Sequence, residues 1–278
     1  MINMKNNRVI KILFIVFFLL ISVSFAEAKN SRIVSMSPNI TEIMFFLGQQ
    51  NHLVGVTASD DYPCAAKNID KIGDFFNPSL EKIIAMQPTY IFSCSSSRHP
   101  VSLQLEKMGY PITDFRVDTL DDIFSMIKDI SQRLGISSNN KIAVLKDRVN
   151  NVKKLPHTKT RKVLILFWDD PLQTVGKRSF INDIVKAAGG KNVFENVDKD
   201  YFQVNAEEIF SRKPDTVLIV MMDGKRKKIV NNQALQSYIT KNHVVVINSL
   251  STDLFLRAGP RVVDAVEQLS RRFETNGK

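Results

Sequence analysis

Short apolar segments rich in β-branched residues alternate with amphipathic segments along most of this 278-residue chain, and this alternation restricts the fold more than any other feature. The apolar segments predict strands at 32–35, 53–56, 89–93, 112–115, 162–167, 192–194, 216–220 and 244–247. The amphipathic segments predict helices at 40–48, 80–86, 102–108, 120–134, 180–188, 206–212, 231–239 and 261–274. Because strands that alternate with helices form mainly parallel sheets covered by helices, we predict an α/β fold.

One amphipathic segment, residues 138–156, divides this pattern into two similar halves. It ends at Pro156, and its apolar residues recur at the spacing of a single helix face: Ile142, Leu145, Val149 and Val152. A helix of this length is a stiff connection, unlike a Gly/Ser-rich linker. We therefore expect two Rossmann-like α/β lobes, residues 29–137 and 157–278, joined by one long rigid helix.

Residues 1–28 have the pattern of a cleaved secretory signal peptide. Positive residues precede an apolar run from Ile12 to Phe25, and small residues follow at Ala26 and Ala28. A membrane anchor is the alternative, but the run is shorter than the ~20 residues needed to span a bilayer. No cysteine lies beside the cleavage site to carry a lipid, so we expect a soluble periplasmic protein.

The chain is basic, with a formal net charge of +10. Charge alone does not identify a partner. The basic run Lys225–Lys228 has no interleaved aromatic residues, and an exported chain rarely meets nucleic acid. We therefore interpret the run as a solvated loop or helix start and expect no nucleic-acid partner.

The two cysteines, Cys64 and Cys94, lie in the part of the chain expected to be exported. Thiols in an oxidising compartment can form a disulfide. The sequence does not give the distance between the two residues that such a bond requires. Whether Cys64 and Cys94 pair is therefore left open.

Patterns for catalysis and metal binding are missing from the sequence. The four histidines are scattered, and neither a G-x-S-x-G nucleophile motif nor a Gly-rich phosphate loop occurs. Adjacent carboxylates such as Asp60 and Asp61 point in different directions, so they do not by themselves form a general acid/base pair. We predict that the protein is not an enzyme and holds neither a metal nor a cofactor.

Polar and aromatic residues follow the predicted strands, at the edge where ligands bind in α/β lobes. Tyr62 follows a strand of the first half and Trp168 a strand of the second, together with several hydroxyl and carboxylate side chains. This composition suits a large, partly polar organic ligand, held in a cleft between the lobes.

Residues 79–91 (SLEKIIAMQPTYI) are echoed by residues 205–217 (NAEEIFSRKPDTV). Each copy has a helix-capping residue followed two places later by a glutamate, which gives Ser79 with Glu81 and Asn205 with Glu207. A glutamate in the first turn of a helix interacts favourably with the helix dipole, by ~0.3–1 kcal/mol, without any partner. Helix stability explains each glutamate singly but not the matched pair.

Several segments resemble the cobalamin and iron-chelate receptors of ABC importers, in the same order and across the whole exported region. In the first half they are 32–42 (RIVSMSPNITE), 54–56, 61–63 (DYP), 72–73 (IG) and 78–83; in the second half they are 176–177, 188–194 (AGGKNVF) and 257–261 (RAGPR). This resemblance implies a monomeric, two-lobed, helix-bridged periplasmic substrate-binding protein that changes shape little when it binds a ligand and passes it to a membrane permease.

The resemblance also implies roles for individual residues. Glu81 and Glu207 match the two glutamates that dock on permease arginines in this family. The resemblance also makes Asp61, Tyr62, Phe75, Phe76, Tyr201 and Asp253 candidate ligand-binding residues. Trp168, which has no matched counterpart in the family, and Arg257, a positive group at the cleft, complete the candidates. Core packing is the alternative for Phe75, Phe76 and Trp168, and loop capping is the alternative for Asp253.

Cobalamin is the expected ligand, and a ferric siderophore is the main alternative. A siderophore would need positive groups at the cleft, which Arg98, Lys177, Arg178 and Arg257 could supply. Haem fits less well, because haem-binding relatives commonly have a tyrosine ligand directly after the Ile-Gly pair that matches Ile72-Gly73. Here that position is Asp74, although Tyr62 or His99 could replace it.

Overall fold

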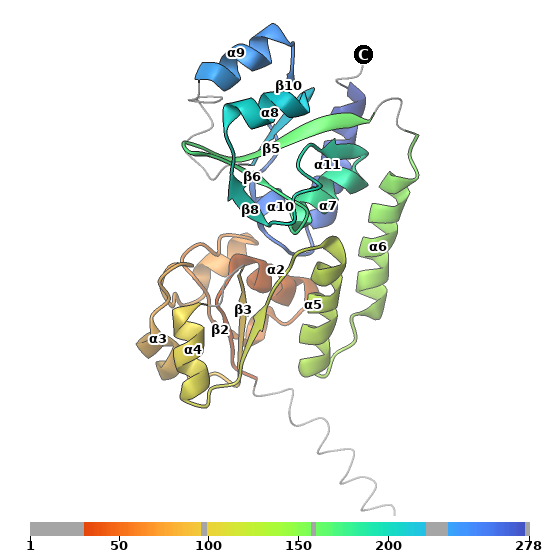
Figure 1. Cartoon of the computed structure of the whole chain (residues 1–278). Coiled ribbons are helices and arrows are strands. Elements are labelled where there is room, and N and C mark those ends of the chain that lie inside the picture. Colours follow the sequence, from red (N-terminus) through yellow and green to blue (C-terminus); the bar gives the residue numbers. More distant parts are fainter. Residues whose placement is uncertain (1–30, 96–98, 157–159, 221–232, 276–278) are drawn as a thin grey trace, which may run out of the picture.

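The computed structural model describes residues 31–95, 99–156, 160–220 and 233–275. These residues form two α/β lobes, one above the other in Figure 1, with a long helix beside both. Among them, no helix is long and apolar enough to cross a membrane. The segment read as a signal peptide and the basic run 225–228 lie outside the described residues. The structure thus has the two-lobed α/β architecture that the alternation of segments predicted.

The N-terminal lobe is built on a four-stranded parallel sheet of order β2-β1-β3-β4. Its strands are β1 (Ile33–Ser35), β2 (Leu53–Gly55), β3 (Tyr90–Cys94) and β4 (Ile112–Phe115). Its helices are α2 (Pro38–Leu47), α3 (Leu80–Ala85), α4 (Pro100–Lys107) and α5 (Leu120–Arg133), with two short 3₁₀ turns, η2 (Gln50–His52) and η3 (Cys64–Asn68). Parallel pairing brings the carboxyl ends of all four strands to one edge.

The C-terminal lobe has a mixed sheet of order β10-β9-β5-β6-β8, with β7 paired beside the start of β5. Its strands are β5 (Arg161–Asp169), β6 (Leu172–Val175), β7 (Gly190–Asn192), β8 (Tyr201–Gln203), β9 (Thr216–Ile219) and β10 (Val245–Ile247). Its helices are α7 (Phe180–Ala187), α8 (Ala206–Arg212), α9 (Gln233–Lys241), α10 (Asp253–Leu256) and α11 (Val262–Thr275). Strands β6 and β8 run antiparallel to their neighbours.

Three elements of the C-terminal lobe were not predicted. Strands β6 and β8 and helix α10 contain only four, three and four residues, too few to show a periodicity. The strand expected at 192–194 lies at Gly190–Asn192 instead, where it pairs with the start of β5. Long-range pairing, and not local propensity, determines these short strands.

Several helices begin or end where their capping residues indicate. Pro38 occupies the first turn of α2, and Gly48 ends that helix with a φ of 80°. The two echoed segments are capped alike, because Ser79 Oγ accepts the Lys82 amide of α3 and Asn205 Oδ1 accepts the Glu208 amide of α8. The repeated sequence therefore encodes the same helix start in both lobes.

The helix between the lobes, α6 (Asn139–Lys153), is attached to both of them. Its four apolar residues are buried, as their spacing predicted. Lys141 Nζ donates to the Phe46 carbonyl of α2 over 2.6 Å. Arg148 forms salt bridges to Asp264 and Glu267 of α11, at 2.7 and 2.8 Å. Polar contacts to one lobe at each end and a buried apolar face hold the helix along the side of the molecule (Figure 1).

The largest hydrophobic cluster runs through both lobes and α6 without a break. It includes Ile33 and Ile123 of the first lobe, Leu145 of α6, and Ile181 and Val263 of the second. Smaller clusters cover the other face of each sheet. Adjacent residues of β1 go to different clusters, as the two-residue period of a strand requires. The lobes are thus joined by a shared apolar core as well as by the chain.

We expect the substitution Leu145→Ala to lower the free energy of unfolding by about 2–5 kcal/mol, because it leaves a cavity where α6 meets the lobes. Leu145 is 4% exposed. Val144 is the matched control, since it is the preceding residue on α6 and is 59% exposed. Val144→Ala should change stability by no more than about 0.5 kcal/mol. Chemical denaturation followed by circular dichroism measures both, and equal effects would contradict the packing described.

Candidate functional site

The two lobes meet where α2 begins, after the carboxyl end of β1. Asn39, in the first turn of α2, donates from Nδ2 to the Ala258 carbonyl of the other lobe over 3.1 Å. Ala258 lies in the loop between α10 and α11. The resembling segments 32–42 and 257–261, more than 200 residues apart in the chain, are therefore in direct contact.

A charged cluster joins the lobes at this contact. Glu42 of α2 is 4% exposed and binds two arginines of the loop. Arg261 donates from Nε and Nη2 to the two carboxylate oxygens, over 2.9 and 2.5 Å, while Arg257 donates from Nη1 over 3.1 Å. Arg257 also reaches Asp61 Oδ1 over 2.7 Å and the Ser59 carbonyl over 3.3 Å.

We refer to Glu42, Asp61, Tyr62, Arg257 and Arg261 as the interlobe cluster. Desolvation alone would raise the pKa of Asp61, but the hydrogen bond and the positive charge of Arg257, with smaller contributions from the backbone and Lys67, together lower it. Burial opposes the charge on both arginines, yet their bonds to the carboxylates raise the pKa of each. The carboxylate and guanidinium groups of the cluster are therefore paired with one another by charge-assisted hydrogen bonds.

Tyr62 adds an aromatic ring to this cluster. The guanidinium carbon of Arg261 lies 3.7 Å from the centre of the Tyr62 ring, a close cation–π contact. The ring is 45% exposed, so one part faces the arginine and the rest faces solvent. Asp61 and Tyr62 belong to one loop, between β2 and η3, and meet the second lobe together.

Within the same loop, the carboxyl group of Asp60 binds a neighbouring residue. This carboxyl group is almost fully buried, and one of its oxygens accepts a hydrogen bond from Thr57 Oγ1. Burial raises the pKa of Asp60, an effect that the hydrogen bond from Thr57 partly offsets. The loop that carries Asp61 and Tyr62 is therefore braced by a buried internal hydrogen bond.

Phe75 and Phe76 lie in the loop before α3, with their rings edge to face at 5.2 Å. Asp74 Oδ1 accepts the amides of Phe76 and Asn77, at 2.8 Å each. Asp74, which occupies the position of the tyrosine ligand in haem-binding relatives, therefore stabilises the conformation of this loop. Phe76 is 65% exposed, whereas Phe75 is half-buried. Phe76 is therefore not a core residue, which leaves its ring on the surface of the first lobe.

His99 connects this loop to α4. Its Nε2 lies 2.6 Å from the Phe76 carbonyl, and its Nδ1 accepts the Val101 amide over 3.2 Å. A carbonyl only accepts, so Nε2 carries the proton and both ring nitrogens are engaged. His99 is consequently not free to bind an iron atom in this arrangement. Arg98, one of the candidate cations, lies outside the described residues.

The candidates of the second lobe lie in different surroundings. Asp253, in the first turn of α10, approaches Arg257 to 3.7 Å and so borders the interlobe cluster. Tyr201 of β8 packs against Phe167, with ring centres 4.8 Å apart, and burial raises its pKa. Trp168 bonds within its own loop, from Nε1 to the Asp170 carbonyl over 2.8 Å. The structure thus brings together four of the eight candidates, Asp61, Tyr62, Asp253 and Arg257.

Cys64 and Cys94 are free thiols in this structure, so the disulfide left open by the sequence is not formed in it. Cys64 is exposed at the start of η3. Cys94 ends β3, and burial raises the pKa of its thiol to about 11. A thiol with so high a pKa is almost entirely protonated at neutral pH and is a poor nucleophile.

Glu81 and Glu207 occupy equivalent positions in the first turns of α3 and α8. Both are exposed. Ser79 Oγ donates to Glu81 over 3.0 Å, and the pKa of Glu81 is lowered by a backbone hydrogen bond and by Ser79. Within the described part of the chain, neither carboxylate takes part in a salt bridge.

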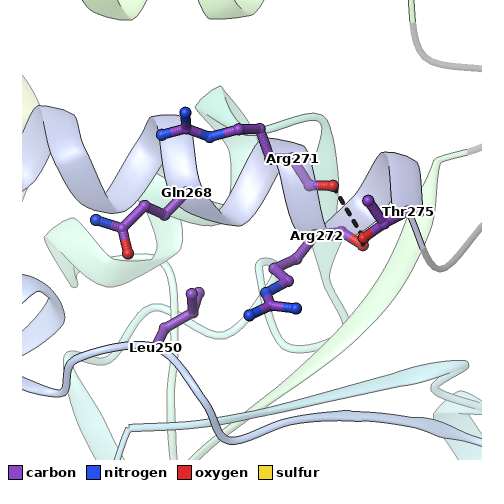
Figure 2. Close-up of a pocket in the computed structure, with 5 residues that line it drawn as sticks. All are labelled: Leu250, Gln268, Arg271, Arg272 and Thr275. Atoms are coloured by element: carbon purple, nitrogen blue, oxygen red, sulfur yellow. Dashed lines mark hydrogen bonds between the residues drawn. The ribbon is translucent and has the colours of Figure 1, made fainter.

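Two hollows lie elsewhere in the structure. A small one of about 280 Å³ lies beside α11 and is lined by Leu250, Gln268, Arg271, Arg272 and Thr275, all labelled in Figure 2. A larger one of about 620 Å³ lies between α5, α6 and α7, where Lys146, Lys153 and Lys186 line it. None of the candidate ligand residues lines either hollow. Within the described ranges, no group of three or more His, Cys, Asp or Glu residues is placed to hold a metal ion.

Comparison with known protein families gives a match over most of the chain. Residues 33–249 fit the model described as "Periplasmic binding protein". The chain belongs to this family. Its members carry ligands and do not transform them, in agreement with the prediction that the protein is not an enzyme.

Curated relatives cover nearly the whole of this periplasmic binding protein. The chain is 28% identical over 255 residues to the vitamin B12-binding protein of Pectobacterium atrosepticum, which covers 88% of each chain. It is also 28% identical over 262 residues to the vitamin B12-binding protein of Vibrio parahaemolyticus, covering 91% of this chain and 93% of the relative.

Solved structures show the same fold. The periplasmic vitamin B12 binding protein BtuF of Vibrio cholerae matches with a TM-score of 0.74 at 23% identity, over 89% of this chain and 98% of the other. The periplasmic heme-binding protein RhuT from Roseiflexus sp. RS-1 also matches with a TM-score of 0.74, at 24% identity, over 90% and 100% of the two chains. The fold is therefore shared by receptors for chemically different ligands.

Two residues of the interlobe cluster were not among the predicted site residues. Glu42 and Arg261 lie in the resembling segments 32–42 and 257–261 but were given no role there. The signal that could have identified Glu42 is its place in α2 directly before the apolar run Ile43–Leu47, because a carboxylate buried there needs a charged partner.

We expect the substitution Glu42→Ala to lower the free energy of unfolding by about 3–5 kcal/mol, because it leaves two arginines partly buried without their shared carboxylate. Asp129→Ala is the control. It removes a more exposed i,i+4 salt bridge to Arg133 on α5, which should contribute less than about 1 kcal/mol. Guanidinium unfolding measures both variants, and a loss below about 1 kcal/mol for Glu42→Ala would contradict the buried pairing.

Proposed function

We propose that this periplasmic binding protein captures cobalamin between its lobes and delivers it to the permease of an ABC importer. Residues 1–28 serve as a cleaved signal peptide in this proposal, and the exported protein acts as a monomer. The names of the curated relatives and their coverage of both chains support the choice of ligand. The ligand is cargo, and the proposal requires no resident cofactor or metal.

The observation that carries the choice of cobalamin is the charge pairing in the interlobe cluster. Arg257, a candidate for binding an anionic siderophore, is instead bound to Glu42, Asp61 and the Ser59 carbonyl. Displacing these partners would break charge-assisted hydrogen bonds to two carboxylates, one of them buried, which is unfavourable. A ligand at this contact therefore meets a neutralised surface, which favours a large ligand with many amide groups over a highly charged one.

Exposed aromatic rings provide the second part of the proposed site. Tyr62 and Phe76 expose their rings on loops of the first lobe, and such rings suit the broad apolar face of a corrin. Tyr201 and Asp253 of the second lobe contribute ring surface and a hydrogen-bond acceptor in this proposal. Phe75 and Trp168 are half-buried, and Phe75 packs edge to face against Phe76, so in this proposal both contribute less ring surface.

The two alternative ligands, an anionic siderophore and haem, would each need side chains that are already engaged in other contacts. An anionic siderophore would depend on Lys177 and Arg178, which are exposed, and Arg178 already lies 3.6 Å from Asp198. Haem would need an axial ligand, but both nitrogens of His99 are engaged. Tyr62 remains, with its ring held against Arg261. These contacts make haem the weaker of the two alternatives.

Permease docking is proposed for Glu81 and Glu207. Their equivalent positions and exposure in the two lobes support this role, since an importer of this kind presents two membrane subunits to its receptor. The repeated sequence places a glutamate at the equivalent position of both lobes. Each glutamate could therefore make the same kind of contact with one of the two membrane subunits.

Calorimetric titration of the exported protein with cyanocobalamin tests the ligand. We expect one-to-one binding with a Kd below about 1 µM, equivalent to −8.2 kcal/mol or better. Ferric enterobactin, an anionic siderophore, and haemin are the parallel controls, and both should produce little heat. Saturation by ferric enterobactin with no response to cyanocobalamin would replace the proposed ligand but keep the family.

A second experiment separates docking from ligand binding. The double variant Glu81→Ala/Glu207→Ala should reduce cobalamin uptake by at least about tenfold, because each lost charge contact costs several kcal/mol at an interface. The affinity of the purified protein for cyanocobalamin should not change. Uptake is measured with labelled cobalamin in cells that carry the cognate permease.

Glu208 provides the matched control for the docking experiment. It lies in the same first turn of α8 as Glu207, but its carboxylate faces Arg212 at 3.7 Å. Glu208→Ala should leave uptake near the wild-type level. A fall in ligand affinity that equals the fall in uptake of the double variant would show that the two glutamates act on binding and not on docking.

A further inference from the structure

The position of the Tyr62 ring depends on a residue of the opposite lobe. Tyr62 belongs to the loop after β2, while Arg261 precedes α11 in the second lobe, and the ring and guanidinium are 3.7 Å apart. Among the described residues, no hydrogen bond holds the Tyr62 hydroxyl group. A half-exposed ring on a surface loop would otherwise move between rotamers, so the contact with Arg261 is what restricts it.

Arg261 is itself held in one orientation. Its Nε and Nη2 atoms bind the two oxygens of Glu42 side by side, over 2.9 and 2.5 Å. This two-point contact fixes the plane of the guanidinium group. Glu42 lies in a helix of the first lobe and is buried, so the plane on which the Tyr62 ring rests is set by the packed core and not by a mobile side chain.

We propose that Arg261 is a positioning residue that holds the Tyr62 ring in place as a flat surface for the ligand, with Glu42 fixing the guanidinium plane. The ligand class is a molecule with a broad, uncharged ring face, so this inference rests on the proposed function. Since the ring and the arginine come from different lobes, this surface exists only at the present spacing of the lobes.

A planar guanidinium group is required for this role. A lysine at position 261 would keep the positive charge, but its ammonium group offers no flat face and cannot bind both oxygens of Glu42 in the same geometry. The substitution Arg261→Lys therefore tests positioning while keeping the charge of the buried cluster. Arg272→Lys is the matched control, because it makes the same change at an exposed position near the end of α11.

The first experiment is a double-mutant cycle in the affinity for cyanocobalamin. Arg261→Lys should weaken binding by about tenfold in the wild-type background, because the Tyr62 ring would no longer be held in place for its contact with the ligand. In the Tyr62→Ala background the same change should weaken binding by less than about twofold, because the ring through which Arg261 acts is gone. Arg272→Lys should have no effect in either background.

The second experiment needs no ligand and uses nuclear magnetic resonance of the exported protein. With labelled tyrosine, Arg261→Lys should move the Tyr62 ring signals toward those of a freely rotating tyrosine. Tyr62→Ala changes an exposed residue and should leave the buried ion pairs intact. In this variant the Arg261 Nε–H signal should lose the chemical-shift contribution of the Tyr62 ring. Its exchange with solvent should remain slow. Slow exchange reports that the bond to Glu42 persists.

The outcomes separate the two proposals. If the wild-type protein does not bind cyanocobalamin, the proposed ligand fails, and the resonance experiment still decides whether Arg261 positions the ring. Unchanged Tyr62 signals in Arg261→Lys would overturn the positioning role. Equal losses of affinity from Arg261→Lys with and without Tyr62 would also overturn it, because the arginine would then act on the ligand or the fold by another route.

Discussion

The buried carboxylate of Glu42 is the interaction on which the contact between the lobes depends. A buried carboxylate is costly unless it is paired, and here both partners come from the other lobe. Pairs of this kind add little net stability compared with a well-packed apolar contact, because desolvation offsets most of the attraction. What they provide is geometry, since two arginines around one carboxylate permit few relative positions of the lobes.

The rest of the site follows from that geometry. With Arg257 bound to Glu42 and Asp61, the loop after β2 is held against the second lobe. Arg257, which the sequence offered as a cation for a ligand, is instead engaged in holding the lobes together. In the proposed site, a ligand at this contact would meet aromatic rings and paired charges, a surface less suited to an anionic chelate.

Short sequence patterns predicted those features of the fold that depend on neighbouring residues. The Ser79 and Asn205 caps, the Gly48 stop and the buried stripe of α6 could all be read from neighbouring residues, because helix starts, stops and faces depend on short spacings. Strands β6 and β8 could not, since each is a few residues long and forms only by pairing with distant segments.

The same distinction applies to the site. Asp61, Tyr62, Asp253 and Arg257 were found through a family resemblance, and the structure places them together. Glu42 and Arg261 were not assigned, although both were within quoted segments, because a salt bridge between residues 219 positions apart leaves no periodic signal. The side-chain hydrogen bonds of His99 and Asp74 were equally invisible, and they determine which metal ligands remain available.

The attachment of α6 to both lobes has a consequence for signalling. A receptor with a long flexible hinge can report its cargo by closing, so that its partner senses the distance between the lobes. Here a shared apolar core, Lys141 and Arg148 oppose such a change of distance. A membrane partner would therefore find a similar outline on empty and loaded molecules, and information about loading would have to come from the ligand itself.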